Sequence, residues 1–284
     1  GVDMFLFLSG IGLWFSWIKT PSARHFFMKR YLRVYPAWLI VACFYYIPRF
    51  HGGDLMAWID LIGDITINWD FWLHDELTFW YIPATMLLYC FAPAYMELIR
   101  RHLIYRWLVV VMILWCVLVQ YVTPIHQVVG HIEIFWSRVP IFFIGINMGE
   151  MVRTKQRIDG TGIWMILIMF VMTLFTSIFL EQSRHGLFPL YIERMLYIPL
   201  TLTTILLLNR VLRRTPRWFN KAFKFVGALS LECYLIHIHF VLDHLPKPWG
   251  YWLTFFVCLL ITLPAAYLLS KIVNLISKSI EKAL

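Results

Sequence analysis

Three ionisable side chains lie close together in an otherwise apolar stretch near the C-terminal end of the chain: Glu232, His237 and His239. On a regular helix Glu232 and His239, seven positions apart, share one face, whereas His237 points elsewhere. An imidazole titrates near neutral pH, so either histidine suits proton abstraction from a hydroxyl group. The alternative is a structural histidine that bonds a neighbouring helix. The two histidines do not converge like the i, i+4 pair of a helical zinc site, so we expect no metal.

Two arginines in a basic, aromatic segment form a second candidate site. Arg30 and Arg33 are three positions apart and therefore lie on one face of a helix. Two guanidinium forks on one face could clamp a phosphate group, and acyl-CoA is a phosphate-rich donor that would fit. The alternative is a basic anchor at the cytoplasmic surface of a membrane protein.

Two further charged residues interrupt apolar stretches, namely Asp3 and Arg138. An ionised side chain within the hydrocarbon region of a bilayer costs on the order of 2.5–3.5 kcal/mol, so its presence indicates a function. We therefore include Asp3 and Arg138, with Glu232 and His237, among the candidate residues of the catalytic pathway.

Residues 49–78 form an acidic segment that contains Trp58, Trp69 and Trp72. Aromatic rings beside acids suit sugar binding, and an interfacial helix with aromatic anchors explains the pattern equally well. His126, His131 and Glu133 form another polar group, which we interpret as loop residues.

The elements that must position these residues are membrane-spanning helices. Hydrophobic residues make up 61% of the 284 positions and charged residues only 14%, whereas soluble domains carry about 25% charged residues. Nine apolar stretches are long enough to be candidate spans, and a single span must be helical to satisfy its backbone in lipid. We thus predict an all-α, polytopic transmembrane bundle with spans at residues 3–18, 34–48, 79–97, 107–122, 134–151, 162–180, 190–208, 225–242 and 251–273.

The basic residues orient these spans. They gather after alternate spans, around Lys19 to Arg33, Arg100 to Arg106, Arg153 to Arg157, Arg210 to Lys224 and Lys271 to Lys282. Basic loops stay cytoplasmic, so the pattern places the C-terminus in the cytoplasm and Gly1 outside. The net charge of +9 is thereby explained by topology and contact with lipid headgroups, not by nucleic acid. An outward Gly1 at the start of a helix leads us to expect one further helix upstream.

The chain shows no internal repeat and no linker-like segment, so we predict a single membrane domain over residues 1–284. Its five cysteines all fall in apolar stretches without metal-like spacing, at Cys43, Cys90, Cys116, Cys233 and Cys258. We interpret them as buried thiols, without a disulfide framework.

Four stretches together resemble the acyltransferase type 3 family. Residues 1–10 are similar to its G-V-D-x-F-F-x-x-S-G opening, residues 27–36 to its F-x-x-R-x-x-R-x-x-P step, residues 138–145 to its R-x-P-x-F-x-x-G helix, and residues 230–237 to its S-x-x-x-Y-L-x-H helix. Each motif alone has low specificity. The four occur in the family's order and extend across nearly the whole chain.

The resemblance implies a ten-helix enzyme of the bacterial plasma membrane that transfers an acyl group, often acetyl, from cytoplasmic acyl-CoA to a hydroxyl of an extracytoplasmic saccharide or lipid-linked glycan. No bound cofactor is implied. The family's Arg-x-x-Arg motif corresponds to Arg30 and Arg33, and its late-helix histidine to His237. The family's first helix carries an essential histidine, which we expect upstream of Gly1. A secondary transporter or flippase of a glycolipid or small anion is the competing interpretation, although the chain lacks the internal symmetry of many transporters.

Overall fold

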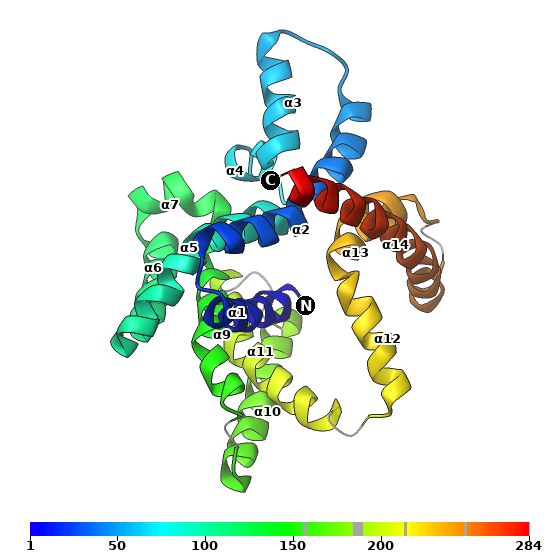
Figure 1. Ribbon diagram of the computed structural model, residues 1–284. Coiled ribbons are helices and arrows are strands. Elements are labelled where there is room, and N and C mark those ends of the chain that lie inside the picture. The colour runs from blue at the N-terminus through cyan, green and yellow to red at the C-terminus, as the bar shows by residue number, and fades with distance from the viewer. Residues whose placement is uncertain (156–157, 184–189, 213–214, 247–248, 284) are drawn as a thin grey trace. The chain divides into compact units, whose positions relative to one another are not determined.

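The computed structural model describes residues 1–155, 158–183, 190–212, 215–246 and 249–283. Every regular element within these residues is helical, which confirms the predicted all-α class (Figure 1). Three of the basic residues used to orient the spans, Arg157, Arg213 and Arg214, lie outside the described residues.

Six helical segments among the described residues are long and apolar enough to cross a membrane. They comprise α1 (Val2–Lys19), α5 (Tyr81–Arg101), α6 (Leu108–Tyr121) with the 3-10 turn that precedes it, α10 (Gly160–Ser183), α11 (Leu190–Leu212) and α14 (Tyr251–Ala283). The chain is therefore a multi-pass membrane protein.

Two further predicted spans are bent helix pairs, not single helices. One pair joins α7 (Thr123–Val129) and α8 (Glu133–Trp136) to α9 (Val139–Arg153) with a bend of 43°. The other joins α12 (Arg217–Ala228) to α13 (Ser230–Ile236) with a bend of 54°. The structure thus gives up to eight spans among the described residues, each bent pair counted as one. The ninth predicted span, residues 34–48, lies mainly in α2 (Ala23–Tyr46), whose basic N-terminal half lowers its hydropathy.

Contacts divide the chain into two compact units. Unit 1 consists of Gly1–Phe26 and Ala84–Arg214, and unit 2 of Phe27–Pro83 and Thr215–Leu284. The boundaries between the units fall inside α2 and α5. Each of these two helices therefore begins in one unit and ends in the other.

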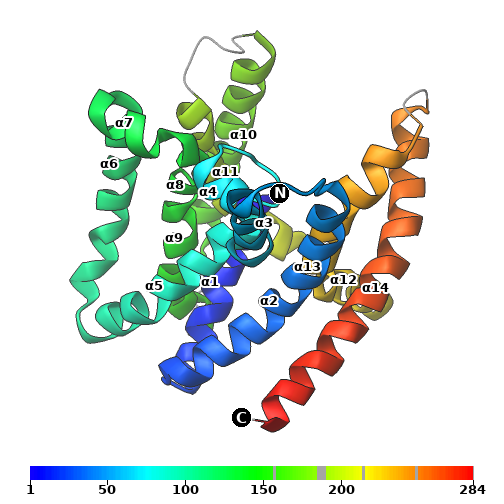
Figure 2. The same cartoon turned by 90° about the horizontal axis from the view of Figure 1, so that it is seen from above.

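Unit 1 is built around the close packing of α1 on α9, which run side by side (Figures 1 and 2). Small residues allow this approach: a Cβ on Gly10 would fall on the Phe142 carbonyl oxygen, and a Cβ on Gly145 on that of Phe7. Without a hydrophobic driving force in lipid, close backbone contact supplies the association energy. Polar bonds add to it, because the Trp14 indole donates to Glu150 at 3.0 Å.

The outer helices of unit 1 present apolar surface. On α10 Trp164, Ile168 and Phe175 are all more than 60% exposed. The hydroxyl of Thr173 on this helix donates to the Met169 carbonyl one turn earlier, at 2.7 Å, so it needs no water. Such a surface is the one expected of a helix that faces lipid.

Unit 2 contains α2, α13 and α14. The Trp38 ring meets the Phe79 ring edge-on at a centroid distance of 5.5 Å, and the Ser277 hydroxyl of α14 donates to the Leu32 carbonyl of α2 at 2.7 Å. An apolar groove of about 450 Å³ lies between α2 and α14, lined by residues such as Tyr35 and Ile276.

Between α2 and α5, most of the acidic segment at residues 49–78 folds into two helices of unit 2. These are α3 (Leu55–Ile67) and α4 (Trp69–Leu73). Asn68 joins them in the left-handed conformation, with φ of 58°, and its buried amide donates to the Thr78 carbonyl at 2.8 Å. The Asp64 carboxylate accepts from the Asp70 backbone N–H at 3.0 Å. Burial, followed by the charge of Asp70, raises the pKa of Asp64 to about 6.

The surface of α3 bears on the two interpretations of this segment. Leu55, Met56, Trp58 and Ile62 are each at least half exposed and apolar. The Trp69 ring is occupied against Gly63, where an added Cβ would overlap it. An exposed apolar face favours the interfacial helix over the sugar platform.

Candidate functional site

Asp3 and Arg138, two predicted pathway residues, form an ion pair in unit 1. Asp3 lies in the first turn of α1, and Arg138 caps α9 at the break that separates it from α8. The Arg138 Nε lies 3.6 Å from the Asp3 Oδ1, and the two side chains are only 12% and 13% exposed. Arg138 also donates through Nη1 to the Ile134 carbonyl at 3.1 Å. The helix break thus frees a carbonyl that the arginine then satisfies.

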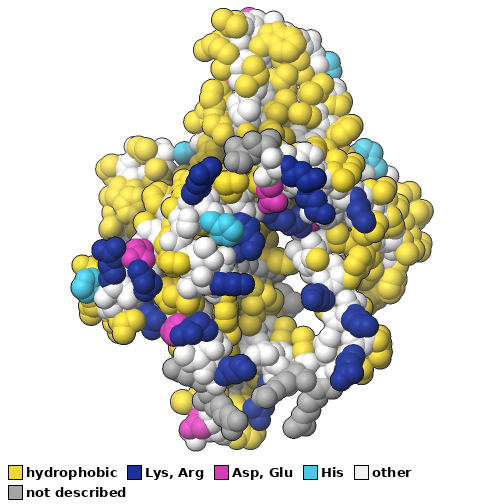
Figure 3. Space-filling view, in the orientation of Figure 1, with side chains coloured by type: hydrophobic (Ala, Val, Ile, Leu, Met, Phe, Trp, Pro, Cys, Tyr) yellow, Lys and Arg dark blue, Asp and Glu magenta, His cyan; other side chains and the backbone are white. Residues whose placement is uncertain are grey.

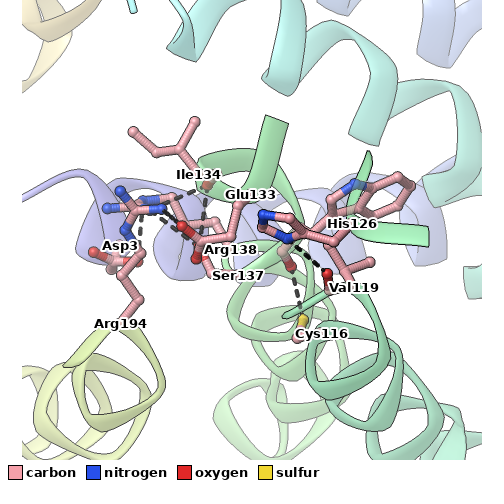
Figure 4. Close-up of polar contacts among 10 residues, drawn as sticks. Asp3, Cys116, Val119, His126, Glu133, Ile134, Ser137, Arg138 and Arg194 are labelled. Carbon is pink, nitrogen blue, oxygen red and sulfur yellow. Dashed lines mark hydrogen bonds and ion pairs between the residues drawn. The ribbon is translucent and has the colours of Figure 1, made fainter. Parts of the chain in front are cut away.

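A second ion pair joins Glu133 of α8 to Arg194 of α11, with both side chains 16% exposed. Figure 4 shows the side chains of Asp3, Glu133, Arg138 and Arg194 gathered between α1, α8, α9 and α11. Two acids and two bases neutralise one another, which makes burial of all four tolerable in a membrane domain. We call these four residues the charge cluster.

Arg194 was missed by sequence reasoning. It lies in α11, within the predicted span at residues 190–208, next to the buried Glu193. The signal was present, because an arginine in an apolar span is itself a functional indicator. The interpretation of His126, His131 and Glu133 as loop residues was wrong: His126 lies in α7, His131 in a 3-10 turn, and Glu133 in α8.

Polar atoms beside the charge cluster have spare hydrogen-bonding capacity. The Trp115 and Trp136 rings meet edge-on at 5.6 Å, and Cys116 fixes this contact by donating to the Trp136 carbonyl at 3.1 Å. Within the described residues, neither indole Nε1 nor the Glu133 Oε1 has a hydrogen-bond partner, although all three atoms are buried. Buried polar atoms without a partner are uncommon in folded proteins, so their presence sets this region apart from the apolar interior around it.

In unit 2 the structure brings together Arg33 and Glu232, which the sequence placed in separate candidate sites. The Glu232 side chain is fully buried and Arg33 is 37% exposed. Arg33 contacts both carboxylate oxygens, and its Nη2 also donates to the Ala228 carbonyl at 2.9 Å. Ala228 ends α12 and Glu232 lies in the first turn of α13, so Arg33 spans the bend between these helices.

Arg30, the other residue of the predicted phosphate clamp, forms no ion pair or hydrogen bond of this kind within the described residues. Its Nε is buried and has no hydrogen-bond partner within the described residues. Arg33 has already committed both Nη atoms to Glu232 and Ala228. Arg33 is therefore engaged within the protein, whereas the terminal guanidinium nitrogens of Arg30 have no ion pair within the described residues.

His237 is held in one orientation by its own helix. Its Nδ1 lies 2.9 Å from the Cys233 carbonyl and 3.0 Å from that of Tyr234. Both partners are acceptors, so the neutral ring carries its proton on Nδ1 and has a lone pair on Nε2. This tautomer is the one that a general base needs if Nε2 faces the proton to be removed.

The helix around the histidines is not regular, contrary to the expected single helix at residues 225–242. It bends beside Leu229 and widens into a π-helical turn at His237–Val241. The expectation that Glu232 and His239 share one face of a regular helix therefore does not hold. The His239 ring packs against Phe79 at 4.7 Å, and its Nδ1 lies 3.2 Å from Asp243. Within the described residues no three His, Cys, Asp or Glu side chains cluster as a metal site would require.

A protein-family comparison covers almost the whole chain. The model of a family described as "Acyltransferase domain" matches residues 1–271. Comparison with curated proteins and with solved structures gives no match.

Proposed function

The chain belongs to the acyltransferase type 3 family and is a membrane acyltransferase that transfers groups other than amino-acyl groups; from this premise we propose that it moves an acyl group, acetyl in the simplest case, from cytoplasmic acyl-CoA to a hydroxyl of an extracytoplasmic saccharide. The family match over residues 1–271 carries the proposal. The acceptor is a free glycan or a lipid-linked one.

The donor binds through Arg30, with Arg33 in support. Arg30 has no ion pair within the described residues and is partly exposed, so its terminal guanidinium nitrogens can donate to a phosphate oxygen of CoA, and Lys29 beside it is exposed. Arg33 keeps more than a third of its side chain accessible while it holds Glu232. In this arrangement Glu232 orients Arg33, and Arg30 supplies most of the contact with phosphate.

For the acceptor, unit 1 offers an aromatic surface beside the charge cluster. The rings of Trp115 and Trp136 retain partial exposure, which leaves surface for stacking on a sugar.

The chemical step is nucleophilic attack of the acceptor oxygen on the thioester carbonyl carbon. The C–O bond forms, the C–S bond breaks, and the hydroxyl proton ends on the thiol of released CoA. With its lone pair on Nε2, His237 is suited to general acid–base transfer of a proton. Guanidinium groups would stabilise the oxyanion formed on the thioester carbonyl.

The orientation follows from the basic segments. Lys and Arg concentrated at one end of successive spans support a cytoplasmic position for that end, together with Arg30, Arg33 and the C-terminus. The protein would then lie in a bacterial plasma membrane, with CoA approaching from the basic side and the saccharide from the other.

The test is acyl transfer by the full-length gene product in proteoliposomes. Acetyl-CoA should release CoA faster when a glycan acceptor is added, and Arg30→Ala should raise KM for the donor. Glu97→Gln, which alters a surface acid of α5, is the control and should leave turnover unchanged. Solute or glycolipid flux without CoA release would instead identify a transporter or flippase and refute the proposal.

A further inference from the structure

The helix α12 has two chemically opposite faces. Arg217, Lys221 and Lys224 are spaced i, i+4 and i+7 and therefore share one face. The opposite face carries aromatic and branched side chains, which are Trp218, Phe219, Phe223 and Val226. The helix contains no Asp or Glu.

Within unit 2 this helix has almost no packing partner. None of its residues is buried, and Trp218, Phe223 and Phe225 are each at least half exposed. Its described ring contacts outside the helix are limited to Phe225 against Tyr267 of α14, at 6.1 Å. Figure 3 shows Lys and Arg side chains exposed over α12. A helix that leaves an aromatic face open needs an apolar medium to cover it.

The bend at Leu229 separates α12 from Ser230–His244, the other half of this candidate span. Arg33 holds this bend by donating to the Ala228 carbonyl and binding Glu232. The segment Ser230–His244 has a length of about 22 Å at 1.5 Å per residue, which is less than the ~30 Å hydrocarbon core. An interfacial helix sinks about 5–10 Å into the headgroup boundary, and that depth makes up the difference.

We propose that α12 is an interfacial helix that lies in the membrane surface, with its aromatic face in the acyl chains and its basic face on anionic phospholipid headgroups. Charge selects this partner, because three cations without a neighbouring acid on the helix attract an anionic surface. The proposal requires only the multi-pass membrane fold and is independent of the acyl donor and acceptor.

Site-directed spin labelling of the full-length protein tests the geometry. In a background with the five native cysteines replaced, labels are attached to Phe223→Cys and Lys221→Cys, and the protein is placed in vesicles of phosphatidylcholine with phosphatidylglycerol. The label on Phe223→Cys should collide with oxygen dissolved in lipid, and the label on Lys221→Cys with a water-soluble relaxation agent. Two water-exposed labels, or two deep in the hydrocarbon, would overturn the proposal.

Lipid selectivity tests the charge. Replacement of both lysines, Lys221→Gln with Lys224→Gln, should lower the enrichment of phosphatidylglycerol around the protein on the order of tenfold. The pair Lys221→Arg with Lys224→Arg keeps the charge and should retain the enrichment. Unchanged enrichment in the Gln variant overturns the proposal. A variant that loses affinity for CoA but keeps its lipid preference overturns it as well, because the basic face then serves the donor.

Discussion

Arg33 holds the buried carboxylate of Glu232 with both terminal nitrogens of its guanidinium group, and the Nη2–Oε2 distance is 3.0 Å. Because the same Nη2 also bonds the Ala228 carbonyl, one side chain of α2 fastens the bend between α12 and α13. This arrangement gives Arg33 a positioning role in addition to any contact with the donor. It separates Arg33 from Arg30, although the sequence motif treats them as equivalent.

Replacing Arg33 by Ala should therefore destabilise the protein. The substitution leaves a fully buried carboxylate without compensation, which costs about 3–5 kcal/mol in a closed site. Because Arg33 is 37% exposed, water reaches its end of the pair and the lower end of that range is expected. Thermal unfolding of the full-length protein in detergent measures the loss.

The second substitution at this pair provides the control. Adding Glu232→Ala to Arg33→Ala should cost little more, since the charge that was left unpaired is gone. Arg30→Ala should leave the unfolding temperature nearly unchanged and weaken CoA binding. Equal stability of Arg33→Ala and the native protein would contradict the assigned role of the pair.

Asp3→Asn should weaken unit 1. The change removes the negative charge that faces Arg138, whose side chain is only 12% exposed, and we expect a loss of about 2–3 kcal/mol. Arg138→Lys should not substitute for arginine, because an ammonium group cannot contact Asp3 and the Ile134 carbonyl as a planar fork does. Unfolding in detergent reports both effects. If Arg138→Lys kept full stability, the fork geometry would be irrelevant.

The sequence was sufficient to predict the membrane class and most of the spans, since these depend on the composition of each stretch. Residues 79–97, for example, fall almost entirely in α5, and residues 162–180 lie inside α10. The bends at Leu229 and Arg138 could not be predicted in the same way. At the first bend Arg33, from a distant segment, bonds the Ala228 carbonyl; at the second Arg138 bonds the Ile134 carbonyl and pairs with the distant Asp3.

The candidate site was predicted in part. Asp3, Arg138, Glu232 and Arg33 stand out as charges in or beside apolar stretches, but spacing along one chain does not indicate which acid meets which base. The pairings of Asp3 with Arg138 and of Glu232 with Arg33 join segments more than 130 positions apart. The tautomer of His237 likewise required the carbonyls of Cys233 and Tyr234 at the end of α13.

Stability should depend on pH through Asp64, in the segment between α2 and α5. Burial and the charge of Asp70 raise its pKa from 3.8 to about 6 in the folded protein. The folded state therefore binds the proton more tightly than the unfolded state does. This contribution is fully present below about pH 4 and is lost as pH rises through about 6, with a size of roughly 1–2 kcal/mol after allowance for solvent screening.

The variant Asp64→Asn isolates this effect. It mimics the protonated carboxyl group, so its unfolding temperature should exceed that of the native protein at pH 7 and should match it near pH 4. Glu76→Gln, at an exposed position of the same segment between α2 and α5, should leave the pH profile unchanged. A native-like profile in Asp64→Asn would assign the pH dependence to another group.

The importance of the close contact between α1 and α9 can be tested with two glycines of α1, Gly10 and Gly12. A Cβ on Gly10 would overlap the backbone carbonyl of Phe142, and backbone atoms cannot move aside as a flexible side chain can. A Cβ on Gly12 would meet no atom within 4 Å. Gly10→Ala should therefore force the helices apart at a cost of about 2–3 kcal/mol, whereas Gly12→Ala should be neutral or slightly stabilising.

Both variants should be compared by thermal unfolding and by acyl transfer in the full-length protein. Separation of α1 from α9 also displaces Asp3 from Arg138, because these residues belong to the same two helices or their caps. Gly10→Ala should thus lose stability and activity together, and Gly12→Ala neither. If Gly10→Ala were as stable as Gly12→Ala, the close approach of the two backbones would not hold unit 1 together.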